Sequence, residues 1–289
     1  MRIGRIDGRL SLLFEDRALD VADASNGRFS ADADLVFPRW PEFAEWAAAR
    51  SSDDAVPFQA HQVGAPLLRP AQVFGIGLNY RAHADEAGVR ETPPSPAVFT
   101  KFVTSITGPC DTVRLPSDQV DWEVELVVVI GREAHEVSEK DAWRHVAGLT
   151  VGQDLSERAV QLSGPVPQFS LGKSYPGFSP IGPAIVTPDE FSDPDDLALS
   201  CALDGEVLQD GRTKDLIFSV PELVARLSDV LPLLPGDLIF TGTPSGVGMG
   251  RNPKRYLPPG GTLVSTIEGI GQLRNPLVAG PRYRGARKP

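Results

Sequence analysis

The sequence predicts a β-rich α+β protein and not a doubly wound parallel sheet. Glycine and proline are frequent, with 28 and 27 among 289 residues, and they follow no period that would indicate a fibre or a linker. Such punctuation is typical of many short strands joined by tight turns. Strand patterns also dominate the chain after about residue 70.

The chain is expected to divide into a small N-terminal α+β domain (residues 1–68), a larger catalytic domain (69–280) and a tail (281–289). Short strands around Arg2–Ile6 and Leu10–Phe14 and a helix near residues 40–50 are predicted in the first part. The tail is basic and contains proline and glycine, so it is expected to be disordered.

Strand patterns outnumber helical patterns in the larger domain. Helices are predicted to begin at Ser138 and Ser219, because each serine has an acidic residue three positions later. The predicted strands are Trp122–Ile130, Gly148–Gln153, Leu199–Leu203, Leu238–Thr241 and Thr262–Ile267. This order of elements favours a β-rich core over βαβ units.

Charge and cysteine content exclude several classes of protein. The net charge of −10, from 28 Lys+Arg and 38 Asp+Glu, would repel a nucleic-acid backbone or an anionic membrane surface. The longest aliphatic run, Leu126–Ile130, is too short to span a bilayer, and the N-terminus lacks the apolar stretch of a signal peptide. Cys110 and Cys201 have no metal-site spacing, which fits a reducing compartment. We therefore expect a cytoplasmic protein with no nucleic-acid or membrane partner.

Two glycine motifs do not meet the requirements of nucleotide binding. Gly75–Tyr80 has a tyrosine where a dinucleotide fingerprint needs its third glycine. Gly172–Ser174 resembles the end of a phosphate-binding loop, but Pro167 stands where the first glycine of that loop belongs. The GxSxG pattern of a serine hydrolase does not occur in the sequence. Metal chemistry is the remaining interpretation.

Acidic residues alternate along the strand predicted near Trp122. A period of two places Asp121, Glu123 and Glu125 on one face. Packed carboxylates repel and raise one another's pKa unless a cation neutralises them. Oxygen ligands suit Mg²⁺, Mn²⁺ or Ca²⁺ better than zinc. The alternative is an edge strand that shows its acidic face to water.

A further carboxylate, Asp154, follows the apolar strand predicted at Gly148–Gln153. Loops at strand ends hold functional groups on a rigid base, so Asp154 is a candidate third metal ligand. The alternative is a helix N-cap, because residues 156–161 can follow as a helix. The spacing leaves both interpretations open.

A histidine and a glutamate are placed to act together as a base. His83 and Glu86 are neighbours on a helical turn that Asn79 could cap. A carboxylate beside an imidazole fixes its orientation and makes it a better base toward water. The alternative is a surface ion pair. Lys173 adds a cation on a constrained loop, and residues 241–248 add hydroxyl and N–H groups like those of an anion-binding nest.

In their order along the chain, these motifs resemble the fumarylacetoacetate hydrolase family, in its shorter bacterial branch. The matching pieces are Gly77–Tyr80 with His83 and Glu86, Val98–Lys101, Asp121–Glu125, Gln153–Asp154 through Arg158 and Gln161, Gly172–Ser174, and Phe240–Gly248. They span about residues 73–278. The resemblance implies a catalytic domain of mixed β-sandwich or β-roll type after a small N-terminal domain, and usually a homodimer.

The resemblance also implies roles for individual residues. The metal ligands would be Glu123, Glu125 and Asp154, the water-activating dyad His83 and Glu86, the enolate-stabilising group Lys173, and the substrate-lining residues Arg158, Gln161, Thr243 and Gly242. The largest family members supply one more metal-binding aspartate near the dyad, and this sequence has no clear counterpart, although Asp85 lies close.

The expected activity is hydrolysis of a C–C bond in an acylpyruvate or related β-diketo acid, with Mg²⁺ or Mn²⁺, or else Ca²⁺, as cofactor. The same site would serve decarboxylation of an oxaloacetate-type 2-oxo acid or isomerisation of a hydroxymuconate-type dienoate. A metabolite-binding protein without catalysis is a third interpretation.

The specificity of such a site depends on the surrounding loops. Residues 87–96 follow the dyad and are interpreted either as a lid or as an ordinary surface loop. Arg90 and Lys101 are candidate anchors for a distal carboxylate of the substrate, with plain surface positions as the alternative.

Overall fold

The computed structural model describes residues 1–86, 88, 91 and 93–281. The lid predicted at 87–96 lies partly outside the described residues, and the candidate anchor Arg90 and the tail from residue 282 lie wholly outside them. Within the described ranges, no helix combines the length and the apolar composition needed to cross a membrane.

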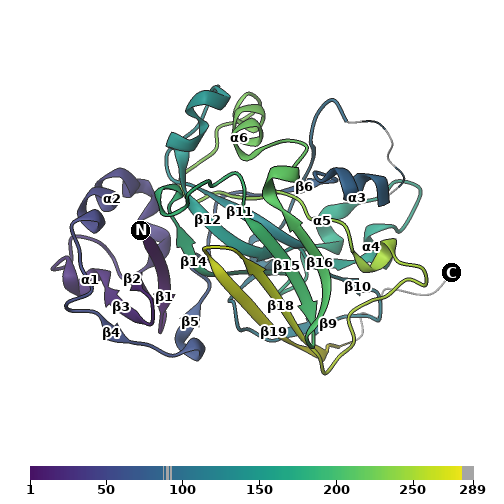
Figure 1. The fold of residues 1–289 in the computed structure, drawn as a ribbon, viewed down its shortest axis with the longest axis horizontal. Helices are drawn as coiled ribbons and strands as arrows, with labels where there is room; N and C mark the ends of the chain where they lie inside the picture. The colour runs from purple at the N-terminus through teal and green to yellow at the C-terminus, as the bar shows by residue number, and fades with distance from the viewer. Residues whose placement is uncertain (87, 89–90, 92, 282–289) are drawn as a thin grey trace.

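A large mixed sheet forms the centre of the molecule (Figure 1). Its central strands, in spatial order, are β14 (Ser179–Val186), β12 (Val146–Gln153), β11 (Val124–Ile130), β17 (Leu238–Phe240), β6 (Val73–Gly77) and β7 (Ala97–Thr100). These neighbours run antiparallel except β17 and β6, which are parallel. The predicted β-rich α+β fold is confirmed.

A second, five-stranded sheet packs against one face of the first. Its order is β16 (Glu206–Arg212), β15 (Ala198–Leu203), β18 (Thr262–Ile267), β19 (Gly271–Ala279) and β9 (Val113–Leu115). Gln153, at the end of β12, joins the two layers, because its amide nitrogen donates to Ser265 Oγ of β18 (3.0 Å). This bond fixes the end of β12, where Asp154 follows.

The N-terminal strands extend the larger sheet. The elements of this region, grouped at one side of Figure 1, are β1 (Arg2–Ile6), β2 (Arg9–Phe14), β3 (Arg17–Asp20), α1 (Val21–Ala24), α2 (Trp40–Ala48) and β4 (Val56–Pro57). β1 pairs with β14 of the central sheet, and β2, β3 and β4 follow outward. Trp40 and Phe43 of α2 are buried, whereas Trp46 is partly exposed. The domain division at residue 68 stays a prediction.

Short elements connect these strands. They are β5 (Val63–Gly64), α3 (Arg81–Glu86), β8 (Ile106–Thr107), β10 (Val120–Asp121), β13 (Ser156–Glu157), α4 (Arg158–Gln161), α5 (Phe169–Gly172) and α6 (Val220–Ser228). The 3-10 helices are Ala33–Leu35, Phe37–Arg39, Ala60–Gln62, Val103–Ser105, Glu139–His145, Pro188–Glu190, Thr213–Asp215 and Gly248–Gly250. Figure 1 shows α3, α4 and α5 on the side away from the N-terminal strands.

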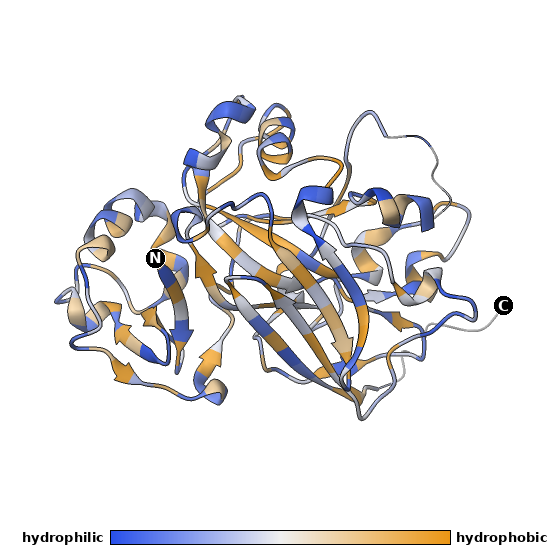
Figure 2. Cartoon of the chain, viewed as in Figure 1, coloured by the Kyte–Doolittle hydropathy of each residue, from blue (hydrophilic) through white to orange (hydrophobic). Residues whose placement is uncertain are grey.

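β11 is buried along its whole length because each face meets a different hydrophobic cluster. Leu126, Val128 and Ile130 pack in the cluster shared with the second sheet, whereas Val127 and Val129 pack with the N-terminal helices. A strand covered on both faces reads as a nearly continuous apolar run, and Figure 2 shows the central strands as predominantly hydrophobic. The acidic residue near the start of this strand is therefore forced into the interior.

The strand predicted at Trp122–Ile130 starts two residues later than expected. The Trp122 N–H donates to the Asp121 carboxylate (2.8 Å), and the Glu123 N–H donates to the Gln153 amide oxygen (2.9 Å). Side-chain acceptors thus replace strand partners at these two positions. The single acidic face predicted for this strand is therefore interrupted between Asp121 and Glu123, because Asp121 belongs to a separate strand, β10.

Both predicted helix starts are found, in different forms. α6 begins after Ser219, whose hydroxyl accepts from the Glu222 N–H (3.4 Å). The stretch after Ser138 is a 3-10 helix, and the serine hydroxyl donates to the Asp141 carboxylate (2.8 Å). The strands predicted at 2–6 and 262–267 are found as predicted, and the other predicted strands differ by one or two residues at one end.

Candidate metal and acid–base site

Three acidic side chains meet where β11 begins and β12 ends. Glu123 precedes β11, Glu125 lies within it and Asp154 follows β12. One oxygen from each carboxylate lies within 4.8 Å of the others, and all three residues are buried. The Asp154 N–H also donates to the Glu123 carbonyl (2.8 Å), which fixes the two strand ends together. The structure thus brings together the three residues predicted as metal ligands.

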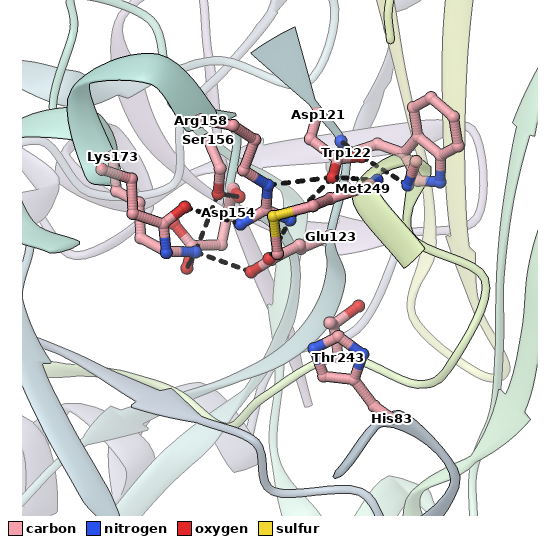
Figure 3. A network of polar contacts seen from close by, with 12 residues as sticks. His83, Asp121, Trp122, Glu123, Asp154, Ser156, Arg158, Lys173, Thr243 and Met249 are labelled. Carbon is pink, nitrogen blue, oxygen red and sulfur yellow. Dashed lines mark hydrogen bonds and ion pairs between the residues drawn. The ribbon is translucent and has the colours of Figure 1, made fainter. Parts of the chain in front are cut away.

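Two cations hold the carboxylate of Glu123, one on each oxygen. Arg158 donates through Nη2 to Oε1 (2.6 Å), and Lys173 donates through Nζ to Oε2 (2.7 Å) (Figure 3). Burial alone would raise the pKa of Glu123, but the charges of Lys173 and Arg158 keep this pKa well below its usual range. Glu123 therefore stays ionised in the interior.

Lys173 uses all of its donors within the protein. Besides Glu123, its Nζ donates to Asp154 Oδ2 (2.7 Å) and Ser156 Oγ (2.8 Å). Burial would lower the pKa of Lys173, but attraction to Asp154 and Glu123 outweighs burial and raises it. An ammonium has three N–H donors, so Lys173 reaches a substrate oxygen only by releasing one of these acceptors, of which Ser156 is the neutral one.

Glu125 is held by a backbone group. Its Oε2 accepts from the Gly242 N–H (2.8 Å), where Gly242 has a φ of 102° and a Cβ would lie 2.7 Å from the Cβ of Asn79. This position therefore requires glycine. Burial, together with the charges of Asp154 and Glu123, raises the pKa of Glu125 well above its usual value. Of the triad, Glu125 is the carboxyl group whose surroundings favour the protonated form, and a bound cation would favour the ionised form.

The donor set fits a hard divalent cation. The triad offers carboxylate oxygens, which Mg²⁺ and Mn²⁺, and also Ca²⁺, prefer over the nitrogen and sulfur ligands typical of zinc. The charged cluster around it consists of the buried carboxylates of Asp121, Glu123, Glu125 and Asp154 and the buried cations Lys101, Lys173 and Arg158. Glu157 is buried as well, but its carboxylate bonds to Ser117 and the Val160 N–H outside this cluster. The cluster holds one carboxylate more than it holds cations. A cation bound at the triad would replace the proton of Glu125.

His83 and Glu86 lie on one turn of α3, as predicted. Nδ1 of His83 is 3.0 Å from Oε2 of Glu86, and the Glu86 carboxylate also accepts from the Gly246 N–H (3.2 Å). A Cβ on Gly250 would lie 2.4 Å from Cδ of Glu86, so this carboxylate packs directly on the backbone. Only 8% of His83 is exposed, so the surface ion pair considered as an alternative is wrong. Figure 3 shows His83 and Thr243 set apart from the bonded charged cluster, on the side on which Glu123 lies.

Thr243, predicted to line the substrate site, is engaged within the protein. Its hydroxyl donates to the Val124 carbonyl (2.9 Å) and accepts from Gln209 Nε2 (2.8 Å). The amide oxygen of Gln209 accepts from the Val124 N–H (3.0 Å). Thr243 and Gln209 together fix the turn after β17 to the start of β11.

Asp121 has a different role from the one its spacing predicted. Its carboxylate accepts from the N–H groups of Gly248 (2.7 Å) and Met249 (2.9 Å), and from Arg158 Nε (2.9 Å). Asp121 therefore connects the turn that supports Glu86 to Arg158, which holds the Glu123 carboxylate. The N–H groups interpreted as an anion-binding nest thus bind carboxylates of the protein itself.

Arg158 and Gln161, also predicted to contact substrate, project from α4 as a bonded pair (Nη1 to Oε1, 2.8 Å). Each is 3% exposed. The N-cap of this helix is Glu157, whose carboxylate accepts from the Val160 N–H (2.6 Å). The interpretation of Asp154 as that N-cap is therefore wrong.

Sequence reasoning missed the side chains that connect distant segments at the site. Lys101, considered as a distal anchor or a surface residue, is 3% exposed and donates to Asp154 Oδ1 (2.5 Å). The amide nitrogen of Asn79, considered as a helix cap, donates to the carbonyls of Phe218 (3.0 Å) and Thr241 (2.7 Å). These partners are far apart in sequence, so spacing carries no signal for them. The one available signal for Lys101 is its place in a motif of the resemblance.

The family model described as the C-terminal part of fumarylacetoacetate (FAA) hydrolase matches residues 72–278. The chain therefore belongs to the fumarylacetoacetate hydrolase family, as the motifs indicated. The fumarylacetoacetate hydrolase domain-containing protein 2 homolog of Dictyostelium discoideum is 45% identical over 290 residues, which cover 94% of this chain and 93% of the relative. Human oxaloacetate tautomerase FAHD2A, mitochondrial, is 44% identical over 216 residues, which cover 74% of this chain and 68% of the relative.

Solved structures agree with this assignment. A structure described as an HpcE protein from Mycobacterium smegmatis is 53% identical, with a TM-score of 0.91 and coverage of 96% of this chain and 99% of that one. A 2-hydroxyhepta-2,4-diene-1,7-dioate isomerase from Mycobacterium marinum is 34% identical (TM-score 0.73, coverage 96% and 98%). Maleylpyruvate hydrolase from Sphingobium sp. SYK-6, in complex with manganese and pyruvate, is 27% identical (TM-score 0.80, coverage 97% and 100%). The family thus includes a relative that binds Mn²⁺.

Cation binding is expected to release about one proton and to tighten as pH rises, because Glu125 must lose its proton to become a ligand. Calorimetric titration with Mn²⁺ in buffers of different ionisation enthalpy measures the proton count. In Glu125→Gln the release should vanish and Mn²⁺ should bind at least about tenfold more weakly. Tight Mn²⁺ binding that does not depend on pH and releases no proton would contradict this assignment.

The same shift predicts how stability depends on pH. The pKa of Glu125 is raised by folding, so the protein without a cation should lose stability as pH rises from the ordinary glutamate pKa through the raised one. Saturating Mn²⁺ should remove this loss, and thermal unfolding scans over that pH range measure both.

Proposed function

We propose that this chain is a divalent-metal-dependent tautomerase or isomerase of a 2-oxo dicarboxylic acid of the oxaloacetate type. The observation that carries the proposal is one oriented base, His83 with Glu86, close enough to the buried carboxylate triad to interact electrostatically with Glu123. Moving a proton next to a carbonyl requires one base and one electrophile, and His83 with a cation at the triad would supply both. Relatives named as oxaloacetate tautomerases and dienoate isomerases support this reaction class.

The chemistry needs little more than proton transfer. A bound Mg²⁺ or Mn²⁺ would supply Lewis-acid polarisation of the substrate carbonyl. His83, oriented through Nδ1 by Glu86, takes the proton from the carbon next to that carbonyl through its other ring nitrogen. The proton returns to the carbonyl oxygen as the enol O–H. One C–H bond breaks and one O–H bond forms, so the step needs no co-reactant.

The charge of the site favours an anionic substrate. With Glu125 ionised, the four carboxylates of the charged cluster face three protein cations and a dication, so the cluster, counted without Glu86 and Glu157, has one positive charge in excess. A 2-oxo carboxylate matches that excess. We propose Gln161 as a direct contact through its amide nitrogen, whereas Arg158, Thr243 and Gly242 act by holding the start of β11.

Hydrolysis of an acylpyruvate or related β-diketo acid is a second candidate. The observation that favours it is the His83–Glu86 dyad, which is equally suited to deprotonate a water molecule. A maleylpyruvate hydrolase shares the fold at 27% identity. Hydrolysis and decarboxylation both break a C–C bond, so product analysis by NMR separates them from tautomerisation.

We further propose a homodimer that forms beside α5. Helix α5 packs against both α4 and β7. Exposed apolar side chains on and around these elements are Val98, Phe102, Val103, Leu162, Val166 and Leu171. Leu171→Glu should then sediment as a monomer while the parent sediments as a dimer, and a monomeric parent would refute the proposal.

The proposed location is the cytoplasm, because unpaired Cys110 and Cys201 fit a reducing compartment.

His83→Ala is expected to slow oxaloacetate tautomerisation in Mn²⁺ by at least about a hundredfold, because the base is removed. Mn²⁺ affinity should stay within a few-fold of the parent, since His83 is not in the triad. His61→Ala, at an exposed histidine, is the matched control and should keep the parental rate. Parental turnover in His83→Ala would refute the assigned base.

Gly250→Ala is expected to lower turnover by at least about tenfold with little change in Tm. The added methyl group would collide with the end of the Glu86 side chain. We expect this side chain to move, because a side chain shifts more easily than backbone does. The kinetic effect should therefore match that of Glu86→Gln. Parental turnover in Gly250→Ala would show that Glu86 does not depend on this contact, and unfolding of the variant would contradict the expected small change in Tm.

A further inference from the structure

Lys101 is a second buried lysine at the site, and the proposed reaction does not use it. It directly follows β7, whose side chains are mostly exposed, yet its own side chain is fully buried. Its Nζ donates to Asp154 Oδ1 (2.5 Å), to the Lys173 carbonyl (2.5 Å) and to the Phe178 carbonyl (3.3 Å). All three N–H donors of the ammonium therefore have acceptors.

These bonds connect Asp154 of the carboxylate triad with Lys173, the residue that the family resemblance assigns to stabilising an enolate. Asp154 has one lysine on each oxygen, with Lys101 on Oδ1 and Lys173 on Oδ2. Lys101 also fixes the main chain of Lys173, at the C-terminal end of α5. A neighbouring bond, from the Phe102 N–H to Ser174 Oγ (3.0 Å), connects the same two segments. The segment at the end of β7 thus holds both the Asp154 carboxylate and the backbone of Lys173 and Ser174 in place.

We propose that Lys101 is a positioning residue, which orients Asp154 toward the cation and holds Lys173 at its three acceptors. This inference rests on the proposed metal-dependent function. It assigns Lys101 no contact with substrate, because its three donors are used by the protein. It also replaces the earlier expectation that Lys101 anchors a distal carboxylate.

A positioning role and a simple charge-balancing role predict opposite effects. Removing a positive charge next to Asp154 would by itself strengthen the binding of a dication. Removing the bonds that orient Asp154 would weaken binding, because a free carboxylate must be ordered when the cation arrives. The sign of the change in Mn²⁺ affinity therefore discriminates between the two roles.

The test is calorimetric titration of Mn²⁺ into the full chain carrying Lys101→Met, which keeps the length of the side chain and removes its charge. We expect binding at least about tenfold weaker than in the parent. At saturating Mn²⁺, kcat for oxaloacetate tautomerisation should fall, because Lys173 would shift from the position in which it is expected to stabilise the enolate. KM should change less than about threefold, because Lys101 makes no contact with the substrate. Lys140→Met, at an exposed lysine, is the matched control and should equal the parent.

Lys101→Gln keeps donor groups without charge, and its Mn²⁺ affinity should lie between those of the parent and Lys101→Met. Equal or tighter Mn²⁺ binding in Lys101→Met would overturn the positioning role in favour of charge balance. If neither variant folds by circular dichroism while Lys140→Met does, Lys101 is purely structural and the proposal fails. If the parent itself does not bind Mn²⁺, the proposed function fails instead.

Discussion

Four carboxylates buried where β11 begins and β12 ends are the constraint on which the rest of this structure depends. An isolated charge in a protein interior costs several kcal/mol even after relaxation, so each of these groups needs a partner. Lys101, Lys173 and Arg158 provide three of them, and the bonds are short and directed at particular oxygens. Glu125 is left to keep a proton or to bind a cation. We propose that a dication completes a site organised in this way.

The fold provides this arrangement by interrupting regular strand structure next to the buried carboxylates. The chain leaves the sheet at Trp122 and Glu123 because side-chain oxygens take over their N–H groups. Gly242 donates its N–H to Glu125, and a Cβ at this position would collide with Asn79. Gly250 packs its backbone on Glu86, and a Cβ there would collide with that side chain. Strands that are buried on both faces supply the rigid base for these departures. Local irregularity on a rigid base thus brings His83 and Glu86 close enough to the triad for His83 to interact electrostatically with Glu123.

The β-rich class, most central strands and the Glu123–Glu125–Asp154 triad could be predicted from the sequence. Alternation and strand ends are local properties, and the order of the motifs made the family recognisable. The role of Asp121 could not be predicted, because it depends on N–H groups of Gly248 and Met249 more than a hundred residues away. Lys101 was hidden for the same reason, since its acceptors lie on other segments. Residue spacing along the chain predicts which side chains share one face of a helix or strand. Burial and charge pairing depend instead on how separate elements pack together.

The central claim is that the three carboxylates form one cation site. The most direct measurement is a crystal structure of the protein grown with Mn²⁺, with anomalous diffraction data. The account predicts one strong anomalous peak within bonding distance of Glu123, Glu125 and Asp154, with Lys101 and Lys173 still on Asp154. A peak elsewhere, such as at the His83–Glu86 pair, or no peak at saturating Mn²⁺, would contradict it.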